Sequence, residues 1–350
     1  MQPEDNLQVQ DAGEAGVLEV IGRIVARPDP DVLVGIGDDA AVLLSRADRR
    51  LVATTDIQVE GVHFRSDLAG PGDVGWKALA VNLSDVAAVG GIPRHALVSL
   101  AVPPTLPLRW IEDFYRGLEE LGTLFGVTVV GGNLATIPGP IVADVMVLGE
   151  VEADLFLRRT GARVGDRLVV TGVLGASAAA LMAWERGVQG AGIERLLAVH
   201  RRPLPRVHEG RVAARSRWAT AMIDLSDGLS TDLLRLCDAN HLGVRLDGAA
   251  VPVDPALRDL AARLHLTSLD LALRGGEDYE LLIAADPQHA EELAQRIQEE
   301  VGTPATVIGE LVSPEEGCIV QREGRRLPLE SLGWDHFRRS AAPGSRKRPS

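Results

Sequence analysis

The chain is organised around three consecutive stretches, DVLVGIGDDAAVLL (residues 31–44), LVATTDIQVEGVHF (51–64) and DVGWKALAVNLSDVAAVGG (73–91). These stretches place four carboxylates inside or beside apolar runs: Asp38, Asp39, Asp56 and Asp85. A lone carboxylate in such surroundings favours its neutral form. Several carboxylates directed at one place are best explained by a divalent cation that keeps them ionised. Because no zinc-type set of His and Cys residues accompanies them, the hypothesis is Mg²⁺ holding a polyphosphate.

The composition is that of a globular protein with an acidic balance. The 350 residues are enough for two domains with separate cores, and 46% hydrophobic with 24% charged residues is an ordinary composition. The net charge of −13 argues against nucleic acid or an anionic membrane as the main partner. An anionic substrate therefore needs a metal or a local cluster of Arg and Lys side chains.

The cysteines and the chain ends favour a cytoplasmic location. Cys237 and Cys318 are far apart and in no metal-ligand spacing, which fits a reducing compartment without disulfides. No run approaches the ~20 apolar residues of a membrane span, and the acidic, polar N-terminus is unlike a signal peptide. We expect residues 1–14 and the basic tail 339–350 to be disordered. Phosphate binding by the tail is the alternative.

Apolar periodicity and turn residues predict helices and strands in alternation. Helices are expected over residues 15–27, 73–89, 106–126 and 287–300 and from residue 176, and strands over 31–44, 51–59, 97–102, 127–132, 140–151 and 167–172. The long alternating strand over 140–151 argues against a purely parallel sheet. The polar, turn-rich segment 155–166 marks a boundary between an N-terminal domain over 15–153 and a C-terminal domain over 154–338.

GIGDDA (35–40) formally matches the fingerprint of a dinucleotide-binding turn, but its chemistry argues against that function. A pyrophosphate needs the free N–H groups of a helix N-terminus, whereas Asp38 and Asp39 would repel it. The AVLL that follows also has the character of a strand. An acidic surface turn is the alternative to a metal site here. No Walker-type G-x-x-x-x-G-K-[ST] is present, which excludes a P-loop route to ATP.

TTD (54–56) is predicted to end a strand with two hydroxyls and a carboxylate, which can ligate Mg²⁺ or donate to phosphate oxygens. An ordinary strand end leading into a turn is the alternative. Further on, His63 is either a substrate contact or a structural hydrogen-bonding group. On the helix over 73–89, Lys77 and Asp85 share one face, with Asn82 beside Asp85. Because this apolar helix should be buried, we favour a metal site over an internal hydrogen-bond network.

Three later turns repeat the pattern of an apolar strand beside polar residues. GGN (131–133) is expected to follow a strand, where its glycines allow either close approach to a phosphate or simply a tight turn. IDLSDG (223–228) ends a strand with two acids and a Ser before a helix, which suits either Mg²⁺ and phosphate binding or helix capping. GGEDYE (275–280) places acids at the start of a strand. Four acidic strand ends in one chain are hard to attribute to turns alone.

With these motifs in view, the chain resembles the thiamine-monophosphate kinase family over roughly residues 15–338. That family belongs to a superfamily of ATP-dependent enzymes that includes aminoimidazole ribonucleotide synthetase, selenophosphate synthetase and a hydrogenase-maturation protein. The resemblance is carried by GIGDDAAVL, TTDIQVEGVHF, GWKALAVNLSDVAAVGGIP, GGN, RRTGARVGD, TGVLGASAAAL, HRRPLPRV, IDLSDGLSTDL, GGEDYEL and GWDHF, in that order.

The resemblance implies a mixed α/β (α+β) fold of two domains, like that of aminoimidazole ribonucleotide synthetase. Strands of the N-terminal domain would pair with those of a second subunit into a barrel across a homodimer. A C-terminal α/β domain would close over ATP and several Mg²⁺ ions, and whether a monovalent cation is also needed stays open.

Site residues are implied by position in the matching motifs. For metal binding these are Asp39, Thr54, Thr55, Asp56, Asp85, Asn133, Asp224 and Asp227. For ATP they are Gly132, Asn133, Arg159 and Ser226, and for thiamine monophosphate they are His63, Glu277, Asp278 and Trp334. Asp56, Asp85 and Arg159 are the expected catalytic residues.

One position departs from the family pattern. The family often has GGDT where this chain has Gly131-Gly132-Asn133-Leu134, and an Arg often found soon afterwards is replaced by Ile137-Pro138. An Asn carbonyl can still ligate Mg²⁺ but brings no negative charge. We therefore expect a weaker metal site at that corner and not a loss of activity.

The implied reaction transfers the γ-phosphate of ATP directly, in line, to thiamine monophosphate. The acceptor phosphate is already anionic near neutral pH, because its second pKa is about 6, so no Ser nucleophile or strong base is required. The rivals are another ATP-dependent enzyme of the superfamily and a non-catalytic nucleotide-binding homologue. No Cys precedes Cys237 and the chain ends in Ser350, which disfavours the selenophosphate and hydrogenase-maturation enzymes, whose reactive Cys lies near one chain end.

Overall fold

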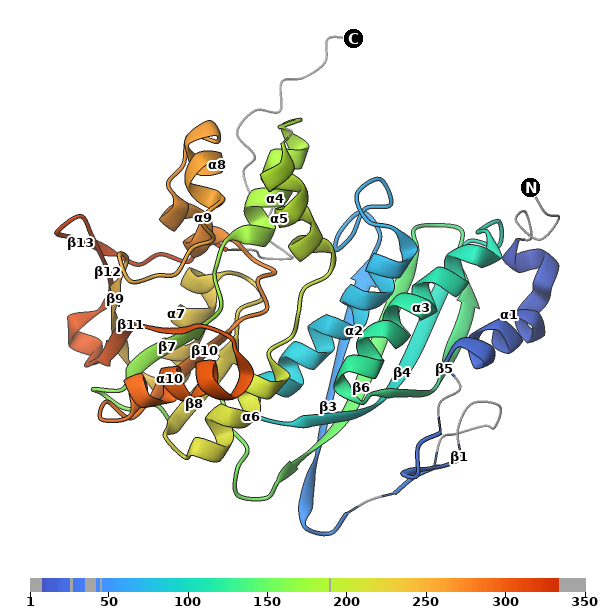
Figure 1. Ribbon diagram of the computed structural model, residues 1–350, viewed down its shortest axis with the longest axis horizontal. Helices are drawn as coiled ribbons and strands as arrows, with labels where there is room; N and C mark the ends of the chain where they lie inside the picture. Colours follow the sequence, from blue (N-terminus) through green and yellow to red (C-terminus); the bar gives the residue numbers. More distant parts are fainter. Residues whose placement is uncertain (1–7, 26–27, 35–41, 45, 189, 334–350) are drawn as a thin grey trace.

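Two large β-sheets lie side by side in the structure, each with helices packed against it (Figure 1). The structure is a computed structural model and describes residues 8–25, 28–34, 42–44, 46–188 and 190–333. The described helices are α1 (Val9–Val25), α2 (Pro71–Ala88), α3 (Leu108–Phe125), α4 (Ala176–Glu185), α5 (Ala191–Arg201), α6 (Val207–Ser216), α7 (Leu229–Asn240), α8 (Leu257–Arg263), α9 (Ser268–Arg274) and α10 (Ala290–Val301), with a short 3₁₀ helix over Pro314–Glu316. None of these described helices is long and apolar enough to cross a membrane.

The sheet nearer the N-terminus has four strands in the order β3-β6-β4-β5. These strands are β3 (Arg49–Val59), β4 (Ile92–Val102), β5 (Thr128–Thr136) and β6 (Val142–Glu152). β6 is antiparallel to both of its neighbours, whereas β4 and β5 are parallel. Two short strands, β1 (Val32–Val34) and β2 (Val42–Leu43), pair with each other in a separate antiparallel ribbon.

The second sheet has seven strands in the order β13-β12-β9-β11-β7-β10-β8. They are β7 (Arg167–Thr171), β8 (Ala219–Asp224), β9 (Gly243–Asp247), β10 (Leu281–Ala285), β11 (Ala305–Val312), β12 (Cys318–Arg322) and β13 (Arg325–Pro328). Only its β12–β9 pair is parallel within the described strands. Both sheets are therefore mixed, which confirms the expectation drawn from the long alternating strand.

Most of the expected helices and strands are present, and the bounds of several differ from those expected. The helix expected over 106–126 is α3, and it ends at Gly126, which has a left-handed conformation with φ 70°. The helix expected over 15–27 is α1, which already begins at Val9, so residues 9–14 are helical and were wrongly expected to belong to a disordered tail. The strand expected over 31–44 was wrong as one element, since β1 and β2 are separate strands and residues 35–41 lie outside the described residues.

Two motifs expected at strand ends lie inside strands. The strand expected over 51–59 is β3, which ends at Val59; TTD (54–56), interpreted as a strand end, therefore lies inside it, because Ile57 and Val59 keep pairing with β6. GGN (131–133) was expected to follow a strand ending at residue 132, with a tight turn as one alternative, but β5 continues to Thr136 and Asn133 pairs with Ser99 of β4. Both errors have one cause: strand pairing satisfies the backbone of polar and glycine residues that local sequence assigns to turns.

Helix α2 lies between the two halves of the molecule and is buried over nearly its whole length (Figure 1). It packs on α3 and on strands β3 and β6 of the small sheet, and on α6 and β8 of the other half. The indole N–H of Trp76 donates a hydrogen bond to the Pro203 carbonyl at 2.8 Å, and the Ser84 hydroxyl donates one to the Asp224 carboxylate at 2.7 Å. Helix α2 therefore fixes how the two halves meet.

Glycines bring α2 and α3 into backbone contact. A Cβ added at Gly75 would lie 1.9 Å from the Phe114 carbonyl oxygen, and one at Gly117 would lie 1.8 Å from the Gly72 carbonyl oxygen. Neither distance is possible for a real Cβ, so any side chain would push the two helices apart. The position of α2 therefore depends on the absence of side chains at this crossing.

We expect Gly117→Ala to lower the free energy of unfolding by about 3 kcal/mol, the upper end of overpacking costs, because backbone and not a flexible side chain must move. Urea unfolding followed by circular dichroism measures this change. The matched control is Gly22→Ala in α1, where nothing lies within 4 Å of an added Cβ. That change should be neutral or stabilising by up to about 1 kcal/mol. Equal effects of the two substitutions would contradict the close-packed crossing.

Candidate active site

Three carboxylates meet where α2, β3 and β8 converge. Asp85 lies near the end of α2 and accepts a hydrogen bond from the Thr54 hydroxyl of β3 at 2.5 Å. Asp224 is the last residue of β8, is 4% exposed, and accepts from Ser84 of α2 at 2.7 Å. Asp56 follows on β3, on the same side of the sheet as Thr54. The structure thus brings together residues that are distant in sequence.

These carboxylates repel one another in a desolvated setting. Burial, then repulsion by Asp85 and by Asp144, raises the pKa of Asp56 to about 7. Burial and repulsion by Asp85 raise the pKa of Asp224 to about 7, against the lowering effect of the Ser84 hydrogen bond. Burial also raises the pKa of Asp85, although the Thr54 hydroxyl and the charge of Arg159 oppose it. The positive charge of Arg159 only partly offsets burial and repulsion at Asp85 and Asp224.

The chemistry of this donor set fits Mg²⁺. The cluster offers hard carboxylate and hydroxyl oxygens, which that ion prefers, and its mutual repulsion is relieved by a cation. Among the residues that the structure describes, no three Asp, Glu, His or Cys side chains are arranged to hold a metal ion by themselves. Mg²⁺ typically takes one or two protein carboxylates and completes its shell with substrate phosphates and water. The set therefore fits an ion that arrives with a phosphate ligand.

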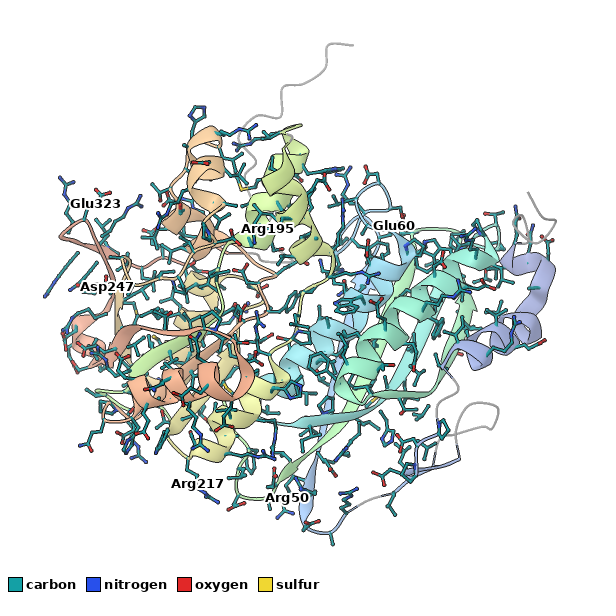
Figure 2. All side chains as sticks on the ribbon, in the orientation of Figure 1. Arg50, Glu60, Arg195, Arg217, Asp247 and Glu323 are labelled. Atoms are coloured by element: carbon teal, nitrogen blue, oxygen red, sulfur yellow. The ribbon has the colours of Figure 1, made fainter. Side chains whose placement is uncertain are left out.

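Neighbouring residues of β3 face opposite sides of the sheet. Arg50 and Glu60, labelled in Figure 2, mark the two ends of this strand region, and TTD lies between them. Thr54 and Asp56 point to the side of α2, whereas Thr55 is exposed on the face that α2 and α3 leave uncovered, called here the open face. The predicted metal residues are therefore divided between two sides of one strand.

Asn133 and Gly132 lie far from the carboxylate cluster. In the order β3-β6-β4-β5, the Asn133 strand is three strand spacings from β3, roughly 14 Å. Asn133 is exposed and, through its pairing with Ser99, lies on the open face. Gly132 has a structural reason to be glycine, since a Cβ there would lie 1.9 Å from the Val98 carbonyl oxygen. Within one chain, these residues do not join Asp56 and Asp85.

The loop after β8 holds the next group of predicted residues. Asp227 pairs with Arg235 at 2.5 Å, and the buried Asp232 accepts from the backbone N–H of Asp227 at 2.9 Å and of Gly228 at 3.1 Å. Ser226 is half-buried and its carbonyl accepts from the Glu277 N–H at 2.7 Å. This loop is thus fixed by contacts that leave the Ser226 hydroxyl without a described hydrogen-bond partner.

Glu277 is held by an ammonium from the other half of the molecule. Lys77 of α2, 4% exposed, lies 2.6 Å from one Glu277 oxygen, and His200 lies 3.2 Å from the other. Burial raises the pKa of Glu277, but attraction to Lys77 and the His200 hydrogen bond outweigh it and lower the pKa to about 2. Glu277 has φ 64°, a left-handed conformation unusual for a residue with a side chain. Its ion pair therefore stabilises a strained turn.

The remaining predicted substrate residues differ in accessibility. Asp278 is 9% exposed and accepts from the Gly175 N–H at 2.8 Å, so it faces the start of α4, and burial raises its pKa well above the usual range. His63 is half-buried, its Nδ1 accepts from the Val59 N–H at 3.1 Å, and its carbonyl accepts from Lys77 at 3.3 Å. Asp39 and Trp334 lie outside the described residues.

Comparison with known proteins identifies the family. Models of the AIR synthase related protein match the chain over residues 37–151 for the N-terminal domain and 163–321 for the C-terminal domain. The thiamine-monophosphate kinase of Bacillus subtilis (strain 168) is 35% identical over 310 residues, which are 87% of this chain and 94% of that protein. The enzyme of Escherichia coli (strain K12) is 37% identical over 88% of this chain and 93% of its own. The chain belongs to the thiamine-monophosphate kinase family.

Solved structures agree with this family membership. The thiamine-monophosphate kinase from Stenotrophomonas maltophilia K279a superposes with a TM-score of 0.79 at 36% identity, over 88% of this chain and 96% of that one. AaThiL complexed with AMPPCP and TMP superposes at 0.73 and 32% identity, over 95% and 99%. Escherichia coli HypE, a hydrogenase maturation protein, superposes at 0.75 over 91% and 97% with 20% identity, which shows the shared fold.

Several residues of this thiamine-monophosphate kinase family member were missed by sequence reasoning. Tyr279 is 7% exposed, and burial with repulsion from Glu277 and Asp56 raises its pKa well above the usual range, which places a neutral phenol near carboxylates of several elements. Ser84 orients Asp224, and Asp144 lies against Thr55. The adjacency of Ser84 to Asp85 is the one signal the sequence offered, since the other contacts cross between strands.

We expect Lys77→Met to lower the free energy of unfolding by about 3 kcal/mol, the low end for breaking a buried ion pair, because Glu277 keeps His200. Lys77→Met with Glu277→Gln should lose less than Lys77→Met alone, since no unpaired carboxylate is then left. Urea denaturation of wild type, both single variants and the double variant at pH 7 gives the coupling energy. A double variant that is additive would contradict the ion pair.

The same pair predicts a pH dependence. Because the pKa of Glu277 is lowered from 4.5 to about 2 in the folded protein, its stabilisation is complete above pH 4.5 and is lost as the pH falls towards 2. Lys77→Met should therefore show a shallower loss of stability in that window than wild type. Parallel acid-stability curves for the two proteins would argue against the pairing.

Proposed function

We propose that the chain catalyses Mg²⁺-dependent transfer of the γ-phosphate of ATP to thiamine monophosphate, giving ADP and thiamine diphosphate. The observation that carries this proposal is the convergence of Asp56, Asp85 and Asp224 in a chain that belongs to the thiamine-monophosphate kinase family. The structural relative AaThiL, complexed with AMPPCP and TMP, supports the same pair of substrates for this chain.

The proposed role of the carboxylate cluster is to hold Mg²⁺ between two anionic substrates. Asp56, Asp85 and Asp224 would hold Mg²⁺, with Thr54 orienting Asp85 and Ser84 orienting Asp224. When bound, Mg²⁺ neutralises phosphate charge and aligns an in-line displacement. Arg159, whose charge is felt at both Asp85 and Asp224, supplies positive charge beside the phosphates.

The substrate side of the site needs no general base. The acceptor phosphate of thiamine monophosphate is largely dianionic at neutral pH, since its second pKa is about 6. Glu277 is ionised and has 28% of its side chain exposed, so it is the candidate contact for thiamine monophosphate, while its charge is already paired with Lys77. Asp278 is turned towards α4, so the contacts favour Glu277 over Asp278 in this role. His63 lies on the loop after β3, and its backbone carbonyl accepts a hydrogen bond from Lys77.

The division into domains follows the break between the two sheets. We place the N-terminal domain, for ATP, Mg²⁺ and dimerisation, over 15–153 and the C-terminal domain over 154–338. In support, β6 ends at Glu152 and the first strand of the larger sheet begins at Arg167. A thiamine diphosphate-forming enzyme that uses ATP fits a cytoplasmic location.

A second copy of the chain is proposed to cover the open face of the small sheet. That face carries exposed apolar side chains on β3, with Leu51 77% and Ile57 48% exposed. Half-exposed Met146 and Leu148 of β6 continue it. An apolar sheet face of this kind is typical of an interface.

Turnover tests the activity directly. Release of ADP should require thiamine monophosphate, with thiamine and aminoimidazole ribonucleotide precursors inactive. ATP binding without turnover on any acceptor would support the non-catalytic homologue, and turnover of an aminoimidazole precursor would support the sister enzyme.

We expect Asp56→Asn and Asp85→Asn each to reduce kcat by about 10²–10³-fold, corresponding to electrostatic contributions of ~3–4 kcal/mol. Circular dichroism should show that both variants stay folded. The control is Asp247→Asn, an exposed acid at the far end of the other sheet (Figure 2), which should leave kcat unchanged. Rates near wild type in both site variants would remove these carboxylates from the mechanism.

We expect Leu51→Glu to shift the protein from dimer to monomer in sedimentation velocity, because it places a charge in the proposed interface. Val164→Glu, at a residue 60% exposed outside the small sheet, is the matched control and should leave the sedimentation coefficient unchanged. A wild-type monomer, or a dimer unaffected by Leu51→Glu, would refute this interface.

A further inference from the structure

Tyr279 is a buried aromatic residue that belongs to none of the hydrophobic clusters formed by the described residues. Its side chain is 7% exposed. Within the described part of the chain, its hydroxyl has no hydrogen-bond partner. Burying a hydroxyl without a partner costs free energy, and buried polar groups in native proteins normally have one. Because the mechanism above gives Tyr279 no role, we looked for its partner in a ligand.

The backbone holds Tyr279 directly beside the end of β8. Its N–H donates to the Leu225 carbonyl at 2.9 Å, and the Leu225 N–H donates to the Glu280 carbonyl at 2.8 Å. These bonds continue the pairing of β10 with β8 one residue past Asp224. Tyr279 has φ 51°, a left-handed conformation that is an outlier for a bulky residue. Backbone strain of this kind is concentrated at functional sites.

The acids on either side of Tyr279 make their contacts elsewhere. Asp278 accepts a hydrogen bond from the Gly175 N–H at the start of α4. Glu280 accepts two from the Arg206 guanidinium, each at 2.6 Å. Both acids are therefore held by the C-terminal half of the molecule, whereas the Tyr279 hydroxyl has no such contact among the described residues.

The phenol of Tyr279 lies between charges from the two ends of the proposed site. Burial raises its pKa well above the usual range, and four carboxylates add to the rise: Glu277, Asp56, Asp224 and Asp227. Glu277 is on the proposed thiamine monophosphate side, and the three aspartates are on the proposed Mg²⁺ and ATP side. An ionised carboxylate can only accept hydrogen bonds, whereas a neutral phenol can donate one. Tyr279 therefore places a donor where its acidic neighbours offer none.

We infer that Tyr279 is a catalytic residue whose phenol O–H donates a hydrogen bond to an oxygen of the phosphoryl group in transfer. This inference rests on the proposed function and deepens it. The bond from Pγ to the β–γ bridging oxygen breaks and its electron pair leaves with ADP, while an oxygen of thiamine monophosphate forms the new bond to Pγ. The phenol keeps its proton throughout. Its O–H stabilises the charge on the equatorial oxygens of the transition state.

Tyr279→Phe tests this role because it removes the hydroxyl and keeps the ring. We expect kcat to fall at least about tenfold, since a hydrogen bond to a charged group is lost, while both KM values stay within about threefold of wild type. The free energy of unfolding in urea should be unchanged or higher, because the hydroxyl has no described partner in the protein. A lower stability with an unchanged kcat would show a structural role and overturn the inference.

The chain offers a matched control because it contains two tyrosines. Tyr115 of α3 is 3% exposed and packs edge-on against Phe114, with 5.4 Å between ring centroids, inside the hydrophobic cluster around α2 and α3. Burial alone raises its pKa. Tyr115→Phe should therefore leave kcat unchanged. Equal kcat values for Tyr279→Phe and Tyr115→Phe would contradict a contact with the phosphoryl group.

Fluorine NMR of the full-length protein labelled with 3-fluorotyrosine tests the contact without turnover. The two tyrosines give two resonances, which the two Phe variants assign. AMPPCP with Mg²⁺ should shift the Tyr279 resonance and leave that of Tyr115 in place. ADP with Mg²⁺ lacks the terminal phosphoryl group and should shift the Tyr279 resonance much less. No shift with AMPPCP, or an equal shift with ADP, would overturn the inference.

Activity separates this inference from the proposed function. If the wild-type protein does not phosphorylate thiamine monophosphate, the proposed function fails, while the fluorine spectra still decide whether Tyr279 contacts the terminal phosphoryl group. If wild type is active and Tyr279→Phe keeps its kcat, the inference fails and the proposed function stands.

Discussion

The close crossing of α2 and α3 is the contact on which the rest of the structure depends. Gly75 and Gly117 let the two backbones touch, which seats α2 deeply enough to be shared by both halves of the molecule. From that position one helix delivers Lys77 to the turn before β10, and Ser84 and Asp85 to the end of β8. The site is therefore assembled by a buried helix and does not depend on flexible loops alone.

Carboxylates at the two ends of the site have pKa values that are shifted in opposite directions. At the carboxylate cluster, burial and then repulsion between neighbouring carboxylates raise the pKa values of Asp56 and Asp224. At the other end, Lys77 lowers the pKa of Glu277 and keeps it ionised. Binding of a cation with a nucleotide should thus release protons at the first end and leave the second unchanged.

Much of this arrangement could be predicted from the sequence. The features that could not be predicted depend on tertiary contacts between elements. The spacing of Lys77 and Asp85 on one apolar helix correctly indicated a buried polar face, and Gly126 correctly marked the end of α3. The interpretation of TTD as a strand end was wrong, because pairing with β6 continues beyond Asp56 to the expected end of the strand at Val59. Neither the contact of Asp144 with Thr55 nor the distance of Asn133 from Asp56 has a local signal, since both follow from the strand order β3-β6-β4-β5.

Because side chains alternate between the two faces along β3, the number of residues in this strand is as important as their identity. Thr54 and Asp56 serve one side of the sheet and Thr55 the other, so a deletion of a single residue between Arg49 and Thr54 that shifted the pairing with β6 would exchange the two sides. Every side chain would still be present, yet the hydroxyl of Thr54 would face away from Asp85. The number of residues in this strand therefore constrains the site as much as their identity does.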